Sequence, residues 1–280
     1  MPTLRKVRHK IAKSPVHAPL AWIRHRSLIP SDVFIASYPR SGNTWLRFML
    51  FQLLLGQSPS FNHVDLVVPD VGKQDKARPV LRNNGRVIKT HEPYRREYKK
   101  AIYLVRDARD VALSEFAYQH ALGLVGDDFD EFLGRFLRGE VNPFGSWTDH
   151  VNSWMSAKDE GRAEILVVRF DDLRRTPELH LERMMEFLAV PIKADTIRRA
   201  VADNSVEKMR DHEKKNPLKA SAKGRFIRSG AVGGWREKFT EAQAQLVRRC
   251  AGAVLDRVGY SGAAVLSSSP TVSEPSVISL

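Results

Sequence analysis

Cysteine is nearly absent from this chain, which has one, Cys250, among its 280 residues. A single cysteine excludes an internal disulfide framework and a zinc site built from cysteines, and it fits a reducing compartment. Long hydrophobic runs are missing from the first thirty residues, which hold neither the apolar core of a signal peptide nor the length of a membrane span. We therefore expect a cytoplasmic protein in which Cys250 is a bystander on a helix.

Acidic residues are missing from the N-terminus. Seven Lys and Arg residues precede Asp32, which is the first acid of the chain. The formal net charge of the whole chain is +13, and a balance this basic favours an anionic ligand, polymer or surface as partner. We interpret residues 1–30 as a solvated basic arm, with peripheral contact to a membrane surface as the alternative.

Four short apolar runs are typical of buried strands, and they cover residues 33–37, 86–90, 101–105 and 164–168. Helical patterns lie between or after them, at residues 44–55, 107–122 and 176–188. Strands that alternate with helices indicate an α/β fold with a P-loop-like parallel sheet and helices on both faces. In such sheets, ligands bind at the carboxyl ends of the strands.

The segments outside these strands and helices indicate where the domain has a long loop and where it ends. Residues 56–85 mix Gly, Pro, Asn and charged side chains, which predicts a long loop region beside the site. Residues 261–280 are rich in Ser and nearly uncharged, which predicts a disordered tail. A single domain is therefore expected over residues 31–260.

The first apolar run leads into a tight loop and a helix, with Tyr-Pro-Arg-Ser-Gly-Asn-Thr-Trp at residues 38–45. Gly42 permits close backbone approach, Ser41 and Thr44 supply hydroxyl groups, and the unpaired N–H groups of a first helical turn favour a phosphate or sulfate. Arg40 adds a cation at the same place. An ordinary helix cap would explain the same residues, so the loop alone leaves both interpretations open.

The second apolar run ends in Lys89, Thr90 and His91. Because alternate residues of a strand share a face, Lys89 and His91 can both face the loop around Arg40. Of the nine histidines, His91 is the one best placed to act as a general base near neutral pH. The alternative is a structural histidine at the end of a strand.

The third apolar run ends in Arg106 and Asp107, and Ser114 follows on the next helix. The Arg106 guanidinium can bind two oxygens of one phosphate group, whereas helix capping explains Asp107. Near the C-terminus, residues 225–240 place glycines among basic and bulky side chains, which suits a flexible segment that closes over an anion.

Aromatic residues gather between positions 116 and 154, and these are Phe116, Tyr118, Phe129, Phe132, Phe136, Phe144, Trp147 and Trp154. They could wall an apolar acceptor pocket. We expect most of them to form core between helices, because large aromatic side chains are usually buried there.

In this order, the clusters resemble the motifs of the cytosolic-type sulfotransferase family that uses 3′-phosphoadenosine 5′-phosphosulfate (PAPS), from about residue 32 to residue 240. Residues 38–45 look like the loop that holds the 5′-phosphosulfate, and residues 89–91 match the family's Lys-Thr-His. Arg106 and Ser114 match the pair that binds the 3′-phosphate, in identity and in spacing.

The resemblance implies roles for individual residues. The implied catalytic residues are His91, Lys89 and Arg40. The implied donor-binding residues are Arg40, Ser41, Gly42, Asn43, Thr44, Trp45, Arg106, Ser114, Phe170, Asn204, Arg228, Ser229 and Gly230. Trp45 would lie against the adenine, and no metal ion is implied.

Four residues depart from the family pattern. Arg40 stands where many members have Lys, which keeps the charge but gives a planar group in place of a mobile point charge. Phe170 lacks the hydroxyl of the family's Tyr, Val206 replaces an aromatic residue, and Ser229 replaces a Lys. The family's dimer motif has no match near the C-terminus, so the resemblance implies no oligomeric state.

The resemblance thus implies in-line transfer of a sulfuryl group from PAPS to a hydroxyl or amine group, with adenosine 3′,5′-bisphosphate as the second product. His91 would take the acceptor's proton, while Arg40 and Lys89 would neutralise charge on the departing phosphate. The acceptor is a small molecule, lipid, glycan or peptide, and no nucleic-acid partner is expected. Two alternatives stay open at this point: a nucleotide-dependent kinase, and a non-catalytic binder of nucleic acid or anionic surfaces.

Overall fold

The computed structural model describes residues 22–58, 63–215 and 230–261. Its centre is a sheet of four parallel strands in the order β2-β1-β3-β4. The strands are β1 (Val33–Ala36), β2 (Val87–Thr90), β3 (Lys100–Val105) and β4 (Glu164–Arg169). All four predicted strands are confirmed, and each end lies within one residue of its predicted position. Both faces of the sheet are covered, which explains why the strands read as continuous apolar runs.

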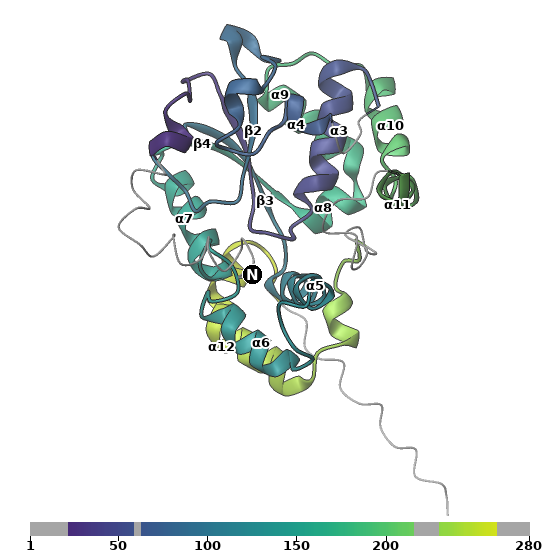
Figure 1. The fold of residues 1–280 in the computed structure, drawn as a ribbon. Coiled ribbons are helices and arrows are strands. Elements are labelled where there is room, and N and C mark those ends of the chain that lie inside the picture. Colours follow the sequence, from purple (N-terminus) through teal and green to yellow (C-terminus); the bar gives the residue numbers. More distant parts are fainter. Residues whose placement is uncertain (1–21, 59–62, 216–229, 262–280) are drawn as a thin grey trace, which may run out of the picture.

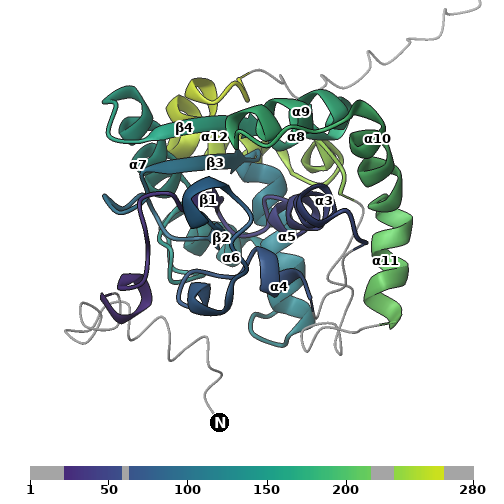
Figure 2. The ribbon, with the colours of Figure 1, turned by 90° about the horizontal axis from the view of Figure 1, so that it is seen from above.

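Helices cover the two faces of the sheet (Figure 1, Figure 2). The helices on one side are α5 (Ala108–Ala121), α6 (Phe129–Leu137), α7 (Trp147–Asp159) and α12 (Glu241–Arg257). The helices on the other side are α3 (Asn43–Leu55), α4 (Val64–Val67), α8 (Phe170–Arg175), α9 (Pro177–Phe187), α10 (Ala194–Asp203) and α11 (Val206–Lys215). Successive strand residues alternate between the two cores, with Phe34 in the first and Ile35 in the second. The predicted α/β class is therefore confirmed.

The three predicted helices correspond to α3, α5 and α9, and their first residues follow from local signals. Asp107 is the N-cap of α5, where its Oδ1 accepts a hydrogen bond of 2.9 Å from Arg109 N. Pro177 is the first residue of α9, as expected for a residue without an N–H group. Thr176 occupies the N-cap position but makes no side-chain cap bond, because its hydroxyl donates to Asp172 O instead.

The prediction of one long loop over residues 56–85 was wrong in part. This region contains the helix α4 and two 3-10 turns, Gln74–Lys76 and Arg82–Asn84. Val64 and Val67 of α4 are buried in the same core as α3. Burial of two apolar side chains against a neighbouring helix favours this short helix, and a composition rich in loop-forming residues does not reveal it.

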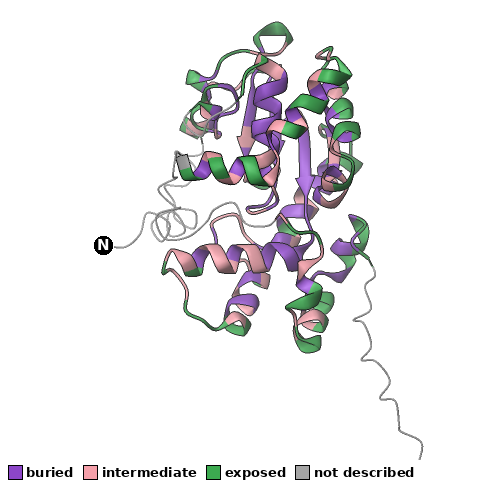
Figure 3. Cartoon of the chain, turned by 90° about the vertical axis from the view of Figure 1, so that its right-hand side faces the viewer, coloured by how far each residue is buried: buried purple, intermediate pink, exposed green. Residues whose placement is uncertain are grey.

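Burial agrees with the layered architecture (Figure 3): β1, β2 and β3 are almost wholly buried, β4 is partly buried, and exposed residues lie on the outer surfaces of the helices. The expectation that most of the aromatic group forms core is met by six of its eight members. Phe132, Phe136, Trp147 and Trp154 are almost fully buried, and Phe116 and Phe129 are partly buried and pack against the same core. Cys250 is exposed on α12. In the part of the chain that the structure describes, no helix has the length and apolar character needed to cross a membrane.

Several predictions lie outside the described residues. These are most of the basic arm (residues 1–21), the C-terminal tail from residue 262, and the two donor-binding candidates Arg228 and Ser229. The domain limits at residues 31 and 260 stay predictions.

Candidate active site

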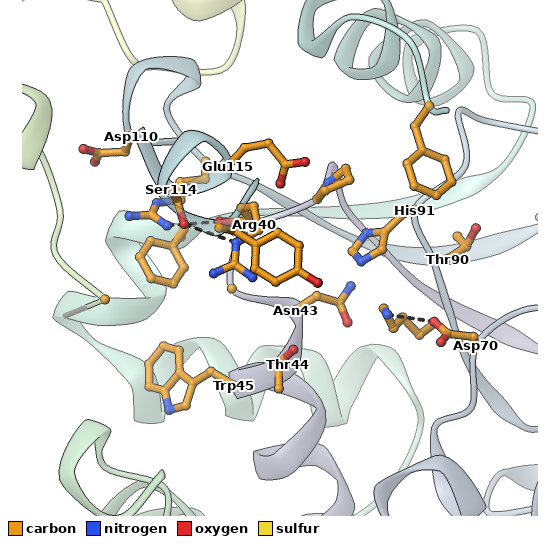
Figure 4. Close-up of a pocket in the computed structure, with 18 of the residues that line it drawn as sticks. Arg40, Asn43, Thr44, Trp45, Asp70, Thr90, His91, Asp110, Ser114 and Glu115 are labelled. Carbon is orange, nitrogen blue, oxygen red and sulfur yellow. Dashed lines mark hydrogen bonds and ion pairs between the residues drawn. The ribbon is translucent and has the colours of Figure 1, made fainter. Parts of the chain in front are cut away.

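A cavity of about 790 Å³ lies at the carboxyl ends of the strands (Figure 4). Its walls come from the loop after β1, the end of β2, the start of α5, the loop before α7 and the segment before η4 (Gly234–Glu237). This volume is typical of a small-molecule site, for which the usual range is about 300–1,000 Å³. The cavity brings together predicted residues that are far apart in the sequence, namely Arg40, Lys89, His91, Arg106 and Ser114.

The loop after β1 has two residues in the left-handed backbone region, Arg40 with φ of 67° and Gly42 with φ of 94°. Gly42 is the N-cap residue of α3. A Cβ atom at this position would overlap the ring of Phe170, the first residue of α8. Glycine is therefore required here both by the backbone conformation and by the ring packed against it.

Buried donors around this loop lack partners among the described residues. Ser41 Oγ and Arg106 Nε are both buried without a hydrogen bond. The first N–H groups of α3, at Asn43, Thr44 and Trp45, have no acceptor within the helix, because the first turn leaves such groups unpaired. Leaving a buried polar atom unsatisfied costs about 1–3 kcal/mol. Unsatisfied donors at a helix N-terminus beside an arginine fit an anionic ligand.

Arg106 connects the loop to the later part of the chain. Its Nη1 donates to Arg40 O at 3.0 Å, and its Nη2 donates to Ala231 O at 2.8 Å. The guanidinium lies over the Phe170 ring, 4.6 Å from its centre. Arg40 in turn donates from Nε to Ser114 Oγ at 3.3 Å. The predicted 5′-phosphosulfate loop and the predicted 3′-phosphate pair are therefore in direct contact.

Asp110, on the first turn of α5, holds the segment that carries Gly230. Its carboxylate accepts hydrogen bonds from Gly233 N at 2.8 Å and from Trp235 N at 3.0 Å. Burial raises the pKa of Asp110, while the charge of Arg106 and these two bonds act to lower it. Gly230, a predicted donor-binding residue, lines the cavity. Sequence reasoning missed Asp110, because nothing near it in the sequence indicates a contact more than a hundred residues away.

His91 lines the cavity with one ring nitrogen already engaged. Its Nδ1 lies 2.7 Å from the backbone carbonyl oxygen of Ser37. A carbonyl oxygen only accepts, so Nδ1 carries the proton of the neutral ring and Nε2 keeps a lone pair. Burial, helped by the charge of Lys89, lowers the pKa of His91 to about 3. His91 is therefore neutral near pH 7 and able to accept a proton at Nε2.

His150, which sequence reasoning missed, contacts the backbone of His91. His150 Nε2 lies 3.1 Å from His91 O, and its Nδ1 lies 3.1 Å from the hydroxyl of Tyr103. The side chain is fully buried, and burial lowers the pKa of His150 to about 4. A neutral ring that donates from Nε2 and accepts at Nδ1 satisfies both neighbours.

Lys89 makes an ion pair with Asp70, with Nζ 2.7 Å from Oδ1 (Figure 4). Burial lowers the pKa of Lys89, and the Asp70 charge acts in the opposite direction. Although burial acts to raise the pKa of Asp70, the charges of Lys89 and Arg47 hold it below its usual value. Asp70 is a third missed residue, since it lies in the region predicted as loop.

The remaining candidates have different positions. Trp45 lines the cavity, donates from Nε1 to Asn204 O at 2.8 Å, and lies under the guanidinium of Arg174. Asn204 is buried behind Trp45 and does not line the cavity. The Asn43 amide donates to Ile35 O and Ser37 Oγ, so this side chain fastens α3 to the end of β1.

Comparisons with known proteins agree with this geometry. A family model described as a sulfotransferase domain matches residues 30–259. The chain is 30% identical over 239 residues to sulfotransferase 1B1 of Canis lupus familiaris, which covers 76% of this chain and 80% of that protein. It is 28% identical over 241 residues to sulfotransferase 1B1 of Mus musculus, with 77% and 80% covered.

Solved structures share the fold. A mouse sulfotransferase, SULT7A1, complexed with PAP is similar with a TM-score of 0.66 at 24% identity, over 87% of this chain and 93% of that chain. A retinol dehydratase in a complex with retinol and PAP is similar with a TM-score of 0.68 at 22% identity, over 86% of each chain. The same arrangement of strands and helices thus occurs in proteins that have been solved in complex with PAP.

Proposed function

This chain belongs to the sulfotransferase family, and from that premise we propose that it transfers the sulfuryl group of PAPS to a hydroxyl or amine group of a small acceptor. The released nucleotide would be adenosine 3′,5′-bisphosphate (PAP). The observation that carries the proposal is the presence, in one cavity, of an anion-binding loop with unsatisfied donors and a neutral histidine. Membership of this family argues against the kinase and the non-catalytic binder. A cytoplasmic location stays a prediction from the sequence.

The donor nucleotide fits the half of the cavity that the β1–α3 loop forms. Ser41 Oγ and the first N–H groups of α3 would bind the 5′-phosphosulfate, beside the charge of Arg40. Arg106 and Ser114 would bind the 3′-phosphate, for which Arg106 Nε is available. Trp45 offers a flat surface for the adenine. Two similar solved structures are named as complexes with PAP, which supports this nucleotide.

His91 is the proposed general base. Its Nε2 lone pair would take the proton of the acceptor as the bond to sulfur forms, a role worth about 10²- to 10⁴-fold in rate. The bond from Nδ1 to Ser37 O fixes the ring orientation and the tautomer. Bound anionic groups favour the protonated form of a nearby base, so donor binding is expected to raise the pKa of His91 from its low value.

Arg40 and Lys89 are proposed to stabilise the charge that develops on the leaving phosphate. PAPS supplies the sulfuryl group, and transfers of this kind resemble phosphoryl transfer, in which alignment and charge stabilisation provide most of the rate. Lys89 is held by Asp70, and Arg40 by Ser114. Fixed cations of this type need little rearrangement during the reaction.

The acceptor is proposed to be a small molecule with a hydroxyl group. One similar solved structure is named as a complex with retinol, and another as a complex with androsterone. Tyr118 and Phe144 supply aromatic surface to the same cavity. An acceptor panel should also include lipids, glycans and peptides that carry a hydroxyl group at an exposed end.

A transfer assay with labelled PAPS against an acceptor panel tests the proposal. We expect His91→Ala to lower turnover about 10²- to 10⁴-fold while PAP affinity, measured by calorimetry, stays within about twofold. His120→Ala is the matched control, since His120 lies on the exposed surface of α5 and does not line the cavity. Full activity of His91→Ala would remove His91 from the mechanism, and failure of the wild-type chain to bind PAP would overturn the donor.

A further inference from the structure

Asp70 lies on a segment that extends the sheet beyond β2. Val71 N donates to Lys89 O at 2.8 Å, and Lys89 N donates to Pro69 O at 2.7 Å, so Asp70 and Lys89 form a parallel bridge. His91 follows Lys89 by two residues, directly after the end of β2, and both residues line the cavity. Figure 4 shows Asp70 and His91 on the same side of the cavity, opposite Ser114.

The segment is fastened on both sides of Asp70. Before it, Arg47 Nε donates to Val68 O at 2.9 Å. After it, Arg24 Nη2 donates to Val71 O at 3.1 Å, and the Gln74 amide donates to Arg24 O at 2.6 Å. Asp70 therefore has a defined position in the cavity wall.

The Asp70 carboxylate has one oxygen engaged and one available. Oδ1 pairs with Lys89, whereas Oδ2 makes no hydrogen bond within residues 22–58, 63–215 and 230–261. The side chain is 42% exposed and lines the cavity. The charges of Lys89 and Arg47 keep the pKa of Asp70 below its usual value, so the group is ionised near pH 7. An ionised carboxylate accepts hydrogen bonds and cannot donate them, so its partner has to be a donor.

We propose that Asp70 Oδ2 selects acceptors that carry a second hydroxyl group next to the one that is sulfated. This inference rests on the proposed function, because it places the reacting hydroxyl at His91 Nε2. The neighbouring hydroxyl of a vicinal diol then donates to Asp70 Oδ2. Asp70 is a specificity residue in this arrangement, and the chemical class of the acceptor is a vicinal diol.

The surroundings favour a neutral donor over a cation. Lys89 Nζ lies 2.7 Å from the same carboxylate and would repel an ammonium group. Arg24, on the same wall, is paired with Glu92 at 2.7 Å, so it adds no unbalanced charge. The Phe144 ring lies 5.8 Å from the His91 ring and offers apolar surface to the body of the acceptor. A hydroxyl group is therefore the donor that fits beside Asp70.

Catechol, 2-methoxyphenol and phenol test the proposal. In 2-methoxyphenol the second oxygen is methylated and cannot donate to Asp70. Hydrogen bonds to charged groups contribute enough for about tenfold discrimination, so we expect kcat/KM for catechol to exceed that for 2-methoxyphenol by about tenfold. In Asp70→Asn the ratio should fall toward one. Loss of the partner of Lys89 affects all three acceptors alike and cancels in the ratio.

Asp65→Asn is the matched control. Asp65 lies on the same stretch of chain, pairs with Arg47 and Lys73, and does not line the cavity. Its acceptor ratio should equal that of the wild type. If the three phenols are not turned over, their dissociation constants from the enzyme–PAP complex replace kcat/KM.

Two results would contradict the inference. One is a wild-type preference no greater than that of Asp70→Asn, and the other is an equal preference for 2-methoxyphenol and catechol. If the chain binds PAP and transfers to all three acceptors without discrimination, the proposed function stands and this inference is wrong. If the chain neither binds PAP nor uses PAPS, the proposed function itself is wrong.

Discussion

The two halves of the cavity differ in how their polar groups are satisfied. In what we call the donor half, the cavity is lined by Arg40, Gly42, Arg106, Ser114 and Phe170, and Ser41 is buried in the same loop without lining the cavity. In the acceptor half, it is lined by Arg24, Asp70, Lys89, His91 and Phe144. In the donor half, Ser41 Oγ and Arg106 Nε are buried without partners in the described part of the chain. In the acceptor half, both cations are paired with carboxylates of the chain itself. The unsatisfied donors of the donor half thus suit an anion from outside, whereas the two cations of the acceptor half are already paired.

Gly42→Ala should have the largest effect, because it damages the donor half directly. A Cβ atom at φ of 94° costs about 1–3 kcal/mol of strain, and overlap with the Phe170 ring adds about the same. We expect PAP affinity to fall about 100-fold or more, which corresponds to roughly 3 kcal/mol. Calorimetry measures the loss of PAP affinity, and a thermal melt measures the loss of stability caused by the strain.

Gly56→Ala is the control for this variant. Gly56 caps the other end of α3, with φ of 69° and no atom within 4 Å of an added Cβ. It therefore incurs the backbone cost without the overlap, and PAP affinity should be retained. Equal loss of affinity in both variants would mean that the contact with Phe170 does not shape the donor half.

Arg106→Ala should weaken the donor half at its 3′-phosphate end. Removing a charged donor costs about 1.5–3 kcal/mol, so PAP affinity should fall about 10- to 100-fold. Affinity for adenosine 5′-phosphate, which lacks the 3′-phosphate, should change much less. Arg96→Ala removes the same charge from a side chain that is 92% exposed and should leave both affinities unchanged. Equal losses for the two nucleotides in Arg106→Ala would disprove the assignment of Arg106 to the 3′-phosphate.

Lys89→Met should alter the electrostatics of the acceptor half. Burial and the charge of Lys89 both hold the pKa of His91 near 3. Without that charge, the pKa of His91 should rise by about one unit, as expected for loss of a nearby like charge. Nitrogen NMR of the imidazole measures this pKa and also reports the tautomer. A proton on Nε2 in the neutral wild-type ring would refute the tautomer derived from Ser37, and titration at the ordinary value of 6.5 would refute the lowered pKa.

His150→Gln should change how stability depends on pH. Burial holds the pKa of His150 near 4 in the folded state, below the ordinary 6.5 of the unfolded chain. Between these values the unfolded chain binds more protons, so wild-type stability falls as pH falls, by about 1 kcal/mol per pH unit. Glutamine does not titrate, so any stability advantage of the wild type at pH 7 should shrink toward pH 5. Denaturant unfolding at several pH values checks this, and parallel stability curves would exclude a neutral buried His150.

Phe170→Tyr should have the smallest effect. The ring packs against Gly42 and lies under the Arg106 guanidinium, and neither contact depends on a hydroxyl group. PAP affinity should stay within about threefold, less than the loss of one hydrogen bond to a charged group. A larger gain measured by calorimetry would show that the donor half lacks a polar contact which the family's tyrosine provides.

Of the donor half, the loop after β1 was predictable because its signal is continuous in the sequence. Residues 38–45 follow one strand and begin one helix, so local backbone rules place them together. The four strands were found for the same reason, since each is one apolar run. The contact between Gly42 and Phe170 was not predictable, because it depends on how α8 leaves the end of β4.

In the acceptor half, the sequence singled out Lys89 and His91, and it named Phe144 only within the aromatic group that could wall an acceptor pocket. Asp70 belongs to a stretch whose composition indicates a loop, and its bridge to Lys89 is made by backbone atoms that carry no sequence signal. His150 contacts His91 across 59 residues, from a helix recognised only as part of an aromatic region. Such contacts arise from tertiary packing, which local patterns do not encode.

The segment that carries Asp70 is joined to the sheet only at its edge, and Arg47 and Arg24 hold it from either side. Val71 within this segment is buried in the core, so protein engineering would keep it and vary Asp70 and Lys73, which line the cavity. Neither position belongs to a strand of the central sheet or to the loop that would hold the nucleotide. New acceptor preferences could therefore be introduced at these two positions, with the donor half kept unchanged.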